Sequence, residues 1–157
     1  MRDKIMDTKK QGHTGTERRS RSESIEEHLT DERADMLVQF CRIAGVEPWE
    51  DQHSAEELKS MLQQFCEILV DYLAAGHFGL YQRFIDGEER REEIRALAEK
   101  LYPQISETTQ MALDFNDKYE SEEHKKLDQS FSDDLSKLGQ ALAVRIELED
   151  QLLSAIH

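Results

Sequence analysis

The chain has 157 residues, with 38% hydrophobic and 34% charged side chains and a formal net charge of −14. This length suits one domain with a real hydrophobic core, and the scarcity of Gly and Pro beside many Glu, Leu, Ala, Lys and Gln favours an all-α fold. No apolar run approaches the roughly 18 residues that span a membrane, and the basic start lacks the apolar segment of a signal peptide, so we expect a cytoplasmic protein without a membrane segment.

The charge is unevenly distributed along the chain. Residues 1–21 hold seven Lys or Arg against three acids, a balance of about +4, so the remainder carries −18 (−14 minus +4). We expect a disordered basic tail over residues 1–21 and a single helical-bundle domain over residues 22–157. The acidic balance argues against direct nucleic acid binding by the folded domain, because phosphate contact needs positive charge, and it favours a basic protein partner. Acidity that serves solubility alone is the alternative.

The first predicted helix runs from near Ser24 to Ala44 and ends at Gly45, a natural helix stop. The next segment, Val46–His53, contains a proline and a tryptophan and is typical of a loop. The apolar positions of this helix recur at helical spacing: Ile25, Leu29, Met36, Leu37, Phe40 and Ile43.

A second helix is predicted to start at Ser54, where Ser54-x-x-Glu57 has the form of a capping box. We expect Gly76 to interrupt this helix, His77–Ile85 to form a short further helix, and Asp86-Gly87 to make a turn. The core stripe of the second helix consists of apolar positions three and four residues apart: Leu58, Met61, Leu62, Phe65, Leu69, Tyr72 and Leu73.

The third long helix has the most regular periodicity, and the pattern passes through Pro103 without losing phase. One kinked helix is therefore predicted rather than two. Residues 120–126 form a polar connection, and a last helix runs from about Leu127 to Ile156. Four long amphipathic helices with short connections predict an antiparallel four-helix bundle with a short extra helix. The apolar stripe of the third long helix consists of Ile94, Ala98, Leu101, Ile105, Thr108, Ala112, Phe115 and Tyr119.

Charged residues interrupt the apolar stripe of the last helix. Arg145 and Glu149 stand where apolar side chains are expected, and the i,i+4 spacing lets them meet. A structural polar network inside the bundle is favoured over a ligand or partner site. His77 could act as a lone base or join that cluster, but a hydrogen-bonded structural histidine is the simpler interpretation. Cys41 and Cys66 are expected to be buried free thiols, not a disulfide.

No motif for catalysis, a metal or a cofactor is evident in the sequence. A di-iron bundle needs paired Glu-x-x-His motifs and a zinc site needs Cys-x-x-Cys pairs; both are missing, as are a glycine-rich phosphate loop and a nucleophile elbow. We therefore expect no metal, no cofactor and no enzymatic activity.

The second helix carries a narrow polar strip of Gln64, Glu67 and Asp71, again at spacings of three and four. Such a strip on an otherwise apolar helix suggests a contact surface for a basic helix. An ordinary solvated helix face is the alternative on these residues alone. The expected aromatic anchors beside the strip are Tyr72, Phe78 and Tyr81.

A resemblance to a known family joins these observations. The stretch Phe65–Phe78, FCEILVDYLAAGHF, resembles the FCxxLVDYxSAGHF signature of the regulator of sigma D (Rsd/AlgQ) family. The likeness continues through Tyr81 and Tyr102–Ile105, and Ala112–Asn116 is most similar to the AlgQ branch. Near the end, Leu138–Asp150 is similar to the family's LGxxLxxRFxLED pattern. The resemblance covers roughly residues 54–156.

The resemblance implies a monomeric, non-enzymatic anti-sigma regulator built as a helical bundle. Members of this family bind the primary sigma factor, chiefly its region 4, and limit its association with core RNA polymerase. Region 4 is a basic helix-turn-helix module that reads the −35 promoter element, so an acidic bundle on that surface competes with promoter DNA. By position, the important acid of the family falls on Asp71.

The first helix departs from the family pattern. The family typically has Trp-Leu followed by a basic residue, whereas this chain has His28–Arg33, HLTDER. The alternative function is therefore a helical-bundle regulator of a different protein, such as a phosphocarrier or a stress-signalling protein, or of a small ligand. A third hypothesis is a ligand-binding or catalytic bundle that uses His77, Arg145 and Glu149.

Overall fold

The computed structural model describes residues 26–45, 54–87, 89–120 and 129–156. Residues 26–44 form the first helix. It is followed by α2 (Ala55–Gly76), the π-helix η1 (His77–Tyr81), α3 (Gln82–Ile85), α4 (Glu92–Tyr119) and α5 (Gln129–Ile156). The predicted tail over residues 1–21, the start near Ser24, the loop Val46–His53 and nearly all of the 120–126 connection lie outside these residues.

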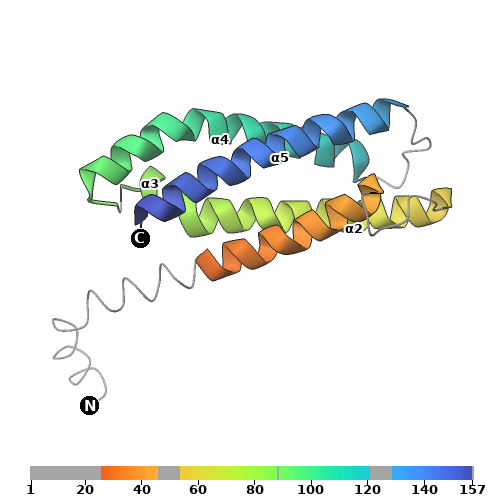
Figure 1. Ribbon diagram of the computed structural model, residues 1–157, viewed down its shortest axis with the longest axis horizontal. Coiled ribbons are helices and arrows are strands. Elements are labelled where there is room, and N and C mark those ends of the chain that lie inside the picture. The colour runs from red at the N-terminus through yellow and green to blue at the C-terminus, as the bar shows by residue number, and fades with distance from the viewer. Residues whose placement is uncertain (1–25, 46–53, 88, 121–128, 157) are drawn as a thin grey trace, which may run out of the picture.

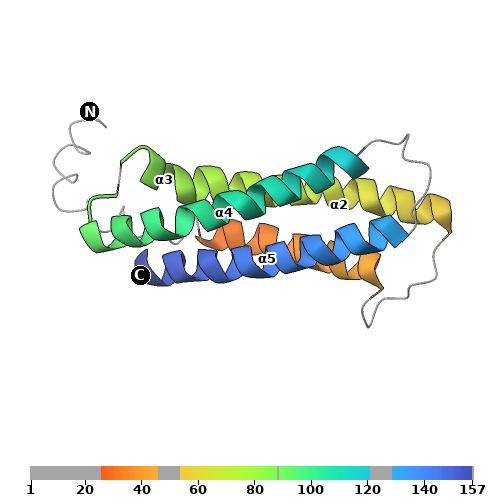
Figure 2. The ribbon, with the colours of Figure 1, turned by 90° about the horizontal axis from the view of Figure 1, so that it is seen from above.

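The four long helices run antiparallel to one another in sequence order (Figures 1 and 2). The first helix and α2 form one side of the bundle, and α4 and α5 form the other, as Figure 1 shows. The predicted antiparallel four-helix bundle is confirmed.

Local signals explain several helix boundaries. The Ser54 side chain caps α2 by accepting a hydrogen bond of 3.1 Å from the backbone N–H of Glu57, as the capping-box pattern predicts. Gly45 has a φ of 72°, which glycine adopts at little cost, so it ends the first helix as expected. Pro103 lies inside α4 without breaking it, which confirms one helix rather than two.

Aromatic rings join the helices in the middle of the bundle. The ring of Phe65 on α2 lies 6.0 Å from those of Phe40 on the first helix and Phe115 on α4, a spacing typical of favourable aromatic pairs. A Cβ at Gly139 of α5 would lie only 2.9 Å from Cζ of Phe40. The missing side chain at Gly139 therefore lets the first helix approach α5 closely.

Two expectations about the helices are wrong. Gly76 does not interrupt α2, because its φ of −65° and ψ of −47° are helical and the chain continues through η1 into α3. The predicted short helix over His77–Ile85 is thus the continuation of α2, half of it in π form. Leu37, expected on the apolar stripe, is exposed.

Candidate partner-binding face and buried polar network

The π-helix decides which way Tyr81 points. Tyr81 follows Tyr72 by nine positions, about two and a half turns of ideal α-helix, which would place the two rings on opposite sides. In η1 the backbone N–H of Gln82 donates to the carbonyl of His77, the five-residue spacing of a π-helix. The wider turn rotates Tyr81 inward, so that both tyrosines are buried.

Glu149 is fully buried on α5 and accepts hydrogen bonds from four side chains. Its Oε1 accepts from the hydroxyl of Tyr72 at 2.5 Å and from Nη2 of Arg33 at 3.2 Å. Its Oε2 accepts from the hydroxyl of Tyr81 at 3.0 Å and from Nε of Arg145 at 3.2 Å. The donors belong to the first helix, α2, η1 and α5, so one carboxylate links four segments of the bundle.

Arg145 extends this network to α4. Its Nη1 donates to Oγ1 of Thr109 at 2.5 Å and to Oγ1 of Thr108 at 3.5 Å. The guanidinium carbon lies 5.4 Å from the ring centroids of both Tyr72 and Tyr81, within the range of cation–π attraction. A buried ion pair is tolerated when further hydrogen bonds satisfy its polar atoms, and the two threonines, the two tyrosines and Arg33 supply such bonds here.

Gly76 provides the space for the network. A Cβ at this position would lie 3.0 Å from Nη2 of Arg145, 3.1 Å from Cε2 of Tyr81 and 3.4 Å from Oε2 of Glu149. These distances are closer than ordinary van der Waals contact. Glycine at this position therefore allows a close approach of Arg145 and Tyr81 and does not serve an unusual backbone angle.

The tyrosine hydroxyls in the network act only as donors. Burial and the nearby charge of Glu149 both raise the pKa of Tyr72 and of Tyr81 far above the ordinary tyrosine value. Both rings therefore keep their protons throughout the physiological range. The carboxylate is the acceptor in each bond.

Arg33 also belongs to the network, although it is not among the site residues predicted from the sequence. Its Nη1 donates to Oδ1 of Asp150 at 2.9 Å, in addition to its bond to Glu149. A signal was present, because Arg33 occupies the apolar stripe of the first helix between Leu29 and Met36. It interrupts that stripe just as Arg145 and Glu149 interrupt the stripe of α5.

His77 lies outside this cluster. The structure brings Arg145 and Glu149 together, whereas His77 is exposed and its ring packs edge-on against Phe78 at 4.8 Å. Both carboxylate oxygens of Glu149 are bonded, and in the described part of the chain the one buried side-chain polar atom without a partner is Nε of Arg33. Glu149 is therefore fully bonded inside the bundle, whereas Arg33 keeps one buried donor without a partner among the described residues.

The polar strip of α2 faces solvent. Gln64, Glu67 and Asp71 are all exposed. On the opposite edge of α2, burial and, to a smaller extent, the charge of Glu120 at the end of α4 together raise the pKa of Cys66 to about 12. Because Cys66 lies on the edge near α4, the strip lies on the other edge, toward the first helix.

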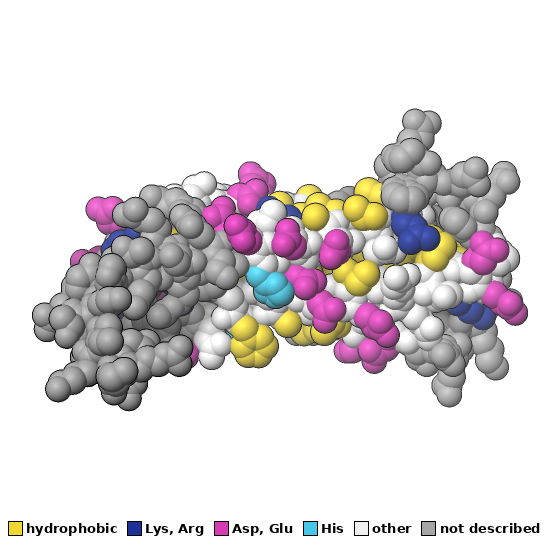
Figure 3. Space-filling model, turned by 90° about the horizontal axis from the view of Figure 1, so that it is seen from below, with side chains coloured by type: hydrophobic (Ala, Val, Ile, Leu, Met, Phe, Trp, Pro, Cys, Tyr) yellow, Lys and Arg dark blue, Asp and Glu magenta, His cyan; other side chains and the backbone are white. Residues whose placement is uncertain are grey.

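The first helix adds acids to the same side of the molecule. Arg33 points toward α5, and residues two positions away are rotated by about 200°, so Asp31 and Asp35 point away from α5 and are exposed. Figure 3 shows acidic side chains gathered across the face formed by the first helix and α2, with hydrophobic side chains among them. We call this surface the acidic face and define it by Glu27, Asp31, Asp35, Glu67 and Asp71.

The side chains of the acidic face are available for a partner. Neither Glu67 nor Asp71 forms an ion pair or hydrogen bond with another described residue through its side chain. Of the three aromatic anchors expected beside the strip, Phe78 is 69% exposed, whereas Tyr72 and Tyr81 are buried in the network. The structure thus leaves Phe78 as the exposed aromatic residue next to the strip.

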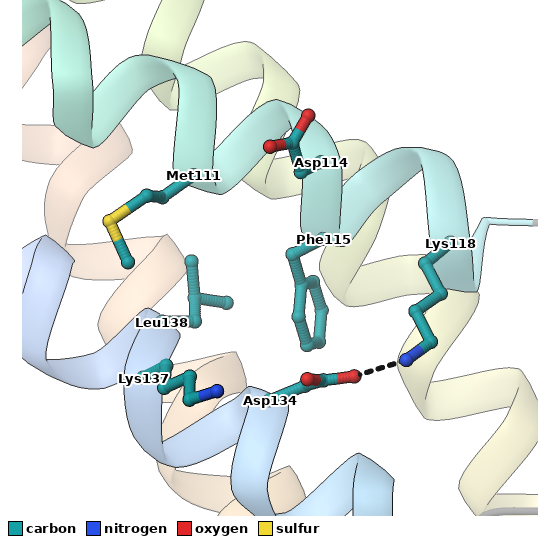
Figure 4. A pocket seen from close by; sticks show the side chains of 7 residues that line it. All are labelled: Met111, Asp114, Phe115, Lys118, Asp134, Lys137 and Leu138. Atoms are coloured by element: carbon teal, nitrogen blue, oxygen red, sulfur yellow. Dashed lines mark hydrogen bonds and ion pairs between the residues drawn. The ribbon is translucent and has the colours of Figure 1, made fainter.

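A small pocket lies between α4 and α5, away from the helices that carry the acidic face (Figure 4). At its edge the carboxylate of Asp134 forms an ion pair of 2.7 Å with Lys118 and accepts a hydrogen bond from the hydroxyl of Tyr119. The pocket has a volume of about 210 Å³. It is lined by Met111, Asp114, Phe115, Lys118, Asp134, Lys137 and Leu138.

Among the described residues, no helix combines the length and the apolar character that crossing a membrane requires. No group of three or more His, Cys, Asp or Glu side chains in the same residues could hold a metal ion.

Comparison with known proteins gives one consistent family. Residues 9–157 match the family model described as "Regulator of RNA polymerase sigma(70) subunit, Rsd/AlgQ". This match extends well before the 54–156 span of the resemblance described above. No solved structure matches the chain at a significant level.

Curated relatives carry the same description. The chain is 36% identical over 125 residues to the "Regulator of sigma D" of Yersinia enterocolitica, covering 77% of this chain and 73% of that protein. It is 36% identical over 143 residues to the "Regulator of sigma D" of an Enterobacter species, covering 88% of this chain and 84% of the relative. The chain therefore belongs to the Rsd/AlgQ family of regulators of the RNA polymerase sigma(70) subunit.

Proposed function

We propose that this protein binds region 4 of the primary sigma factor through its acidic face and so limits the association of that factor with core RNA polymerase and the promoter. The observation that carries the proposal is the position of Asp71. It is exposed, has no ion-pair partner among the described residues, and stands at the centre of the family signature.

Charge complementarity supports this choice of partner. A helix-turn-helix module that reads DNA is basic, and the acidic face offers five carboxylates from two adjacent helices. Oppositely charged surfaces accelerate encounter and favour the correct partner. Phe78 supplies an apolar group at the border of these charges, which fits the common pattern of an anchor ringed by polar contacts.

The buried network supports the face from below. Tyr72 directly follows Asp71 and donates to Glu149, while Arg33 lies between Asp31 and Asp35 and donates to the same carboxylate. The backbones that carry the acids are therefore fixed relative to each other. A preorganised surface loses less conformational entropy when it binds.

Substitution of Asp71 tests the proposal. If this carboxylate becomes a desolvated contact, Asp71→Ala should weaken binding of purified region 4 by about 2 kcal/mol or more, which is about a 30-fold rise in Kd. Helicity and thermal stability should stay unchanged, because the side chain bonds to no described residue.

Glu107→Ala is the matched control. Glu107 is exposed on α4, on the other side of the bundle, and its loss makes the same change in net charge. Its Kd should change by less than about twofold at 0.15 M salt, where exposed charges are screened beyond about 8 Å. Equal effects of the two substitutions, or no effect of Asp71→Ala, would remove Asp71 from the binding surface.

A further inference from the structure

The acidic face has a candidate occupant within this chain. Residues 1–21 carry about +4 against −18 for the remainder, and three of their arginines, at positions 18, 19 and 21, lie close to the first described residue. We propose that this arginine cluster, Arg18, Arg19 and Arg21, docks on the acidic face of its own chain and competes there with the basic partner. This inference rests on the proposed function and adds a regulation of the same site.

The network fixes the register between the first helix and α2. Arg33 and Tyr72 both donate to Oε1 of Glu149, so these two residues lie at the same level of the bundle. The helices are antiparallel, and each residue rises about 1.5 Å. Glu26, seven residues before Arg33, therefore lies at the level of η1, about 12 Å along the bundle from the level of Asp71.

This distance is within reach of the arginine cluster. Arg21 precedes Glu26 by five positions, and an extended chain spans up to about 3.3 Å per position, or about 16 Å in total. The tether between Glu26 and Arg21 is therefore long enough for Arg21 to reach the level of Asp71. The longer tethers to Arg19 and Arg18 are long enough to reach the level of Glu67.

The chemistry of the two partners matches. Arginine forms paired hydrogen bonds with carboxylates and keeps its charge at every physiological pH. Asp31, Asp35, Glu67 and Asp71 have no side-chain partner among the described residues, so each can accept such a bond. A short tether holds its ligand at an effective concentration on the order of 1 mM, so even a weak contact is populated for much of the time.

Paramagnetic broadening in the full-length chain tests the contact without any sigma factor. A nitroxide is attached at Ser20→Cys in a Cys41→Ser background, where the remaining Cys66 is buried and reacts poorly. At low salt we expect the backbone amides of Asp71 and Glu67 to broaden more than in the same labelled protein with Arg18, Arg19 and Arg21 changed to Gln. The excess should vanish in 0.5 M NaCl, and equal broadening in the two proteins would overturn the proposal.

Competition with the partner is measured separately. The triple change Arg18→Gln, Arg19→Gln and Arg21→Gln should lower the Kd for region 4 at least about twofold at low salt, as expected when tethered and free ligands compete on equal terms. The control, Lys4→Gln, Lys9→Gln and Lys10→Gln, makes the same change in net charge farther from the face and should have a smaller effect. Equal effects would overturn the competition.

The two measurements separate the inference from the proposed function. Broadening that depends on the arginines supports docking even if region 4 does not bind. Binding of region 4 that depends on Asp71, without arginine-dependent broadening, leaves the proposed function standing and removes the docking.

Discussion

Removal of the Glu149 carboxylate should destabilise the bundle strongly. Glu149→Ala leaves the guanidinium of Arg145, only 1% exposed, without its anion. The same change removes the acceptor of two buried tyrosine hydroxyls and of one Arg33 bond. The perturbation thus affects side chains from the first helix, α2, η1 and α5 at once.

The expected loss follows from these contacts. Breaking a buried ion pair by removing one partner costs about 3–5 kcal/mol, because a charge remains buried without compensation. Each orphaned hydroxyl could add to this figure, but water that enters the vacated space would offset part of that cost. We therefore expect a total loss of about 3–5 kcal/mol in the free energy of unfolding. This is a large share of the roughly 5–15 kcal/mol that is typical of whole proteins.

Urea unfolding followed by circular dichroism measures this loss. With a slope of about 2 kcal/mol per molar urea, the midpoint should fall by about 1.5–2.5 M. Glu147→Ala is the matched control, since it removes the same side chain from an exposed position two residues earlier in α5. The control should change the free energy of unfolding by no more than about 0.5 kcal/mol.

A small effect would refute the reasoning. If Glu149→Ala and Glu147→Ala lower the midpoint equally, the network does not stabilise the bundle. The four hydrogen bonds to Glu149 would then be incidental to the packing of the helices.

Three further predictions concern the described side chains. Gly76→Leu should lower the urea midpoint of unfolding, because the new side chain would occupy the space of the Arg145 guanidinium. A raised midpoint would mean that the better helix propensity of leucine outweighs the crowding. Burial alone would raise the pKa of Glu89, but hydrogen bonds and charge from Arg91 lower it. The resulting stabilisation exists above about pH 4.5 and is lost as the pH falls through the lowered pKa of Glu89. The unsubstituted protein should therefore lose more free energy of unfolding between pH 6 and pH 3.5 than the Arg91→Met variant does. An equal loss in the two proteins would contradict this prediction. Cys66, whose thiol pKa burial raises to about 12, should react with a thiol reagent at pH 7.5 only on unfolding, and fast labelling of the folded protein would contradict its burial.

The helices were predictable because their signals are local. Period-3.6 apolar stripes, the Ser54 cap and the stop at Gly45 depend only on neighbouring residues, and the structure agrees with each apart from the exposed Leu37. The continuation through Pro103 followed from the unbroken phase of the stripe. Arg145 and Glu149 could be paired from their spacing alone.

The inward turn of Tyr81 could not be predicted from periodicity. An ideal α-helix places Tyr81 opposite Tyr72, and only the π-helix at His77–Tyr81 brings both hydroxyls to Glu149. The π-turn here depends on contacts between helices, and the periodicity of one helix gives no information about such contacts. Gly76, just before that segment, suggested a helix stop, whereas it serves the close approach of Arg145.

Binding of a truncated sigma factor tests the central claim most directly. Purified primary sigma factor, the same factor lacking region 4, and isolated region 4 are each titrated into the full-length chain by calorimetry. The account predicts that the full factor and isolated region 4 bind, and that Asp71→Ala weakens both about 30-fold. It also predicts that truncation abolishes binding. Unchanged affinity for the truncated factor would contradict the account. A failure of both the full sigma factor and isolated region 4 to bind would contradict it as well.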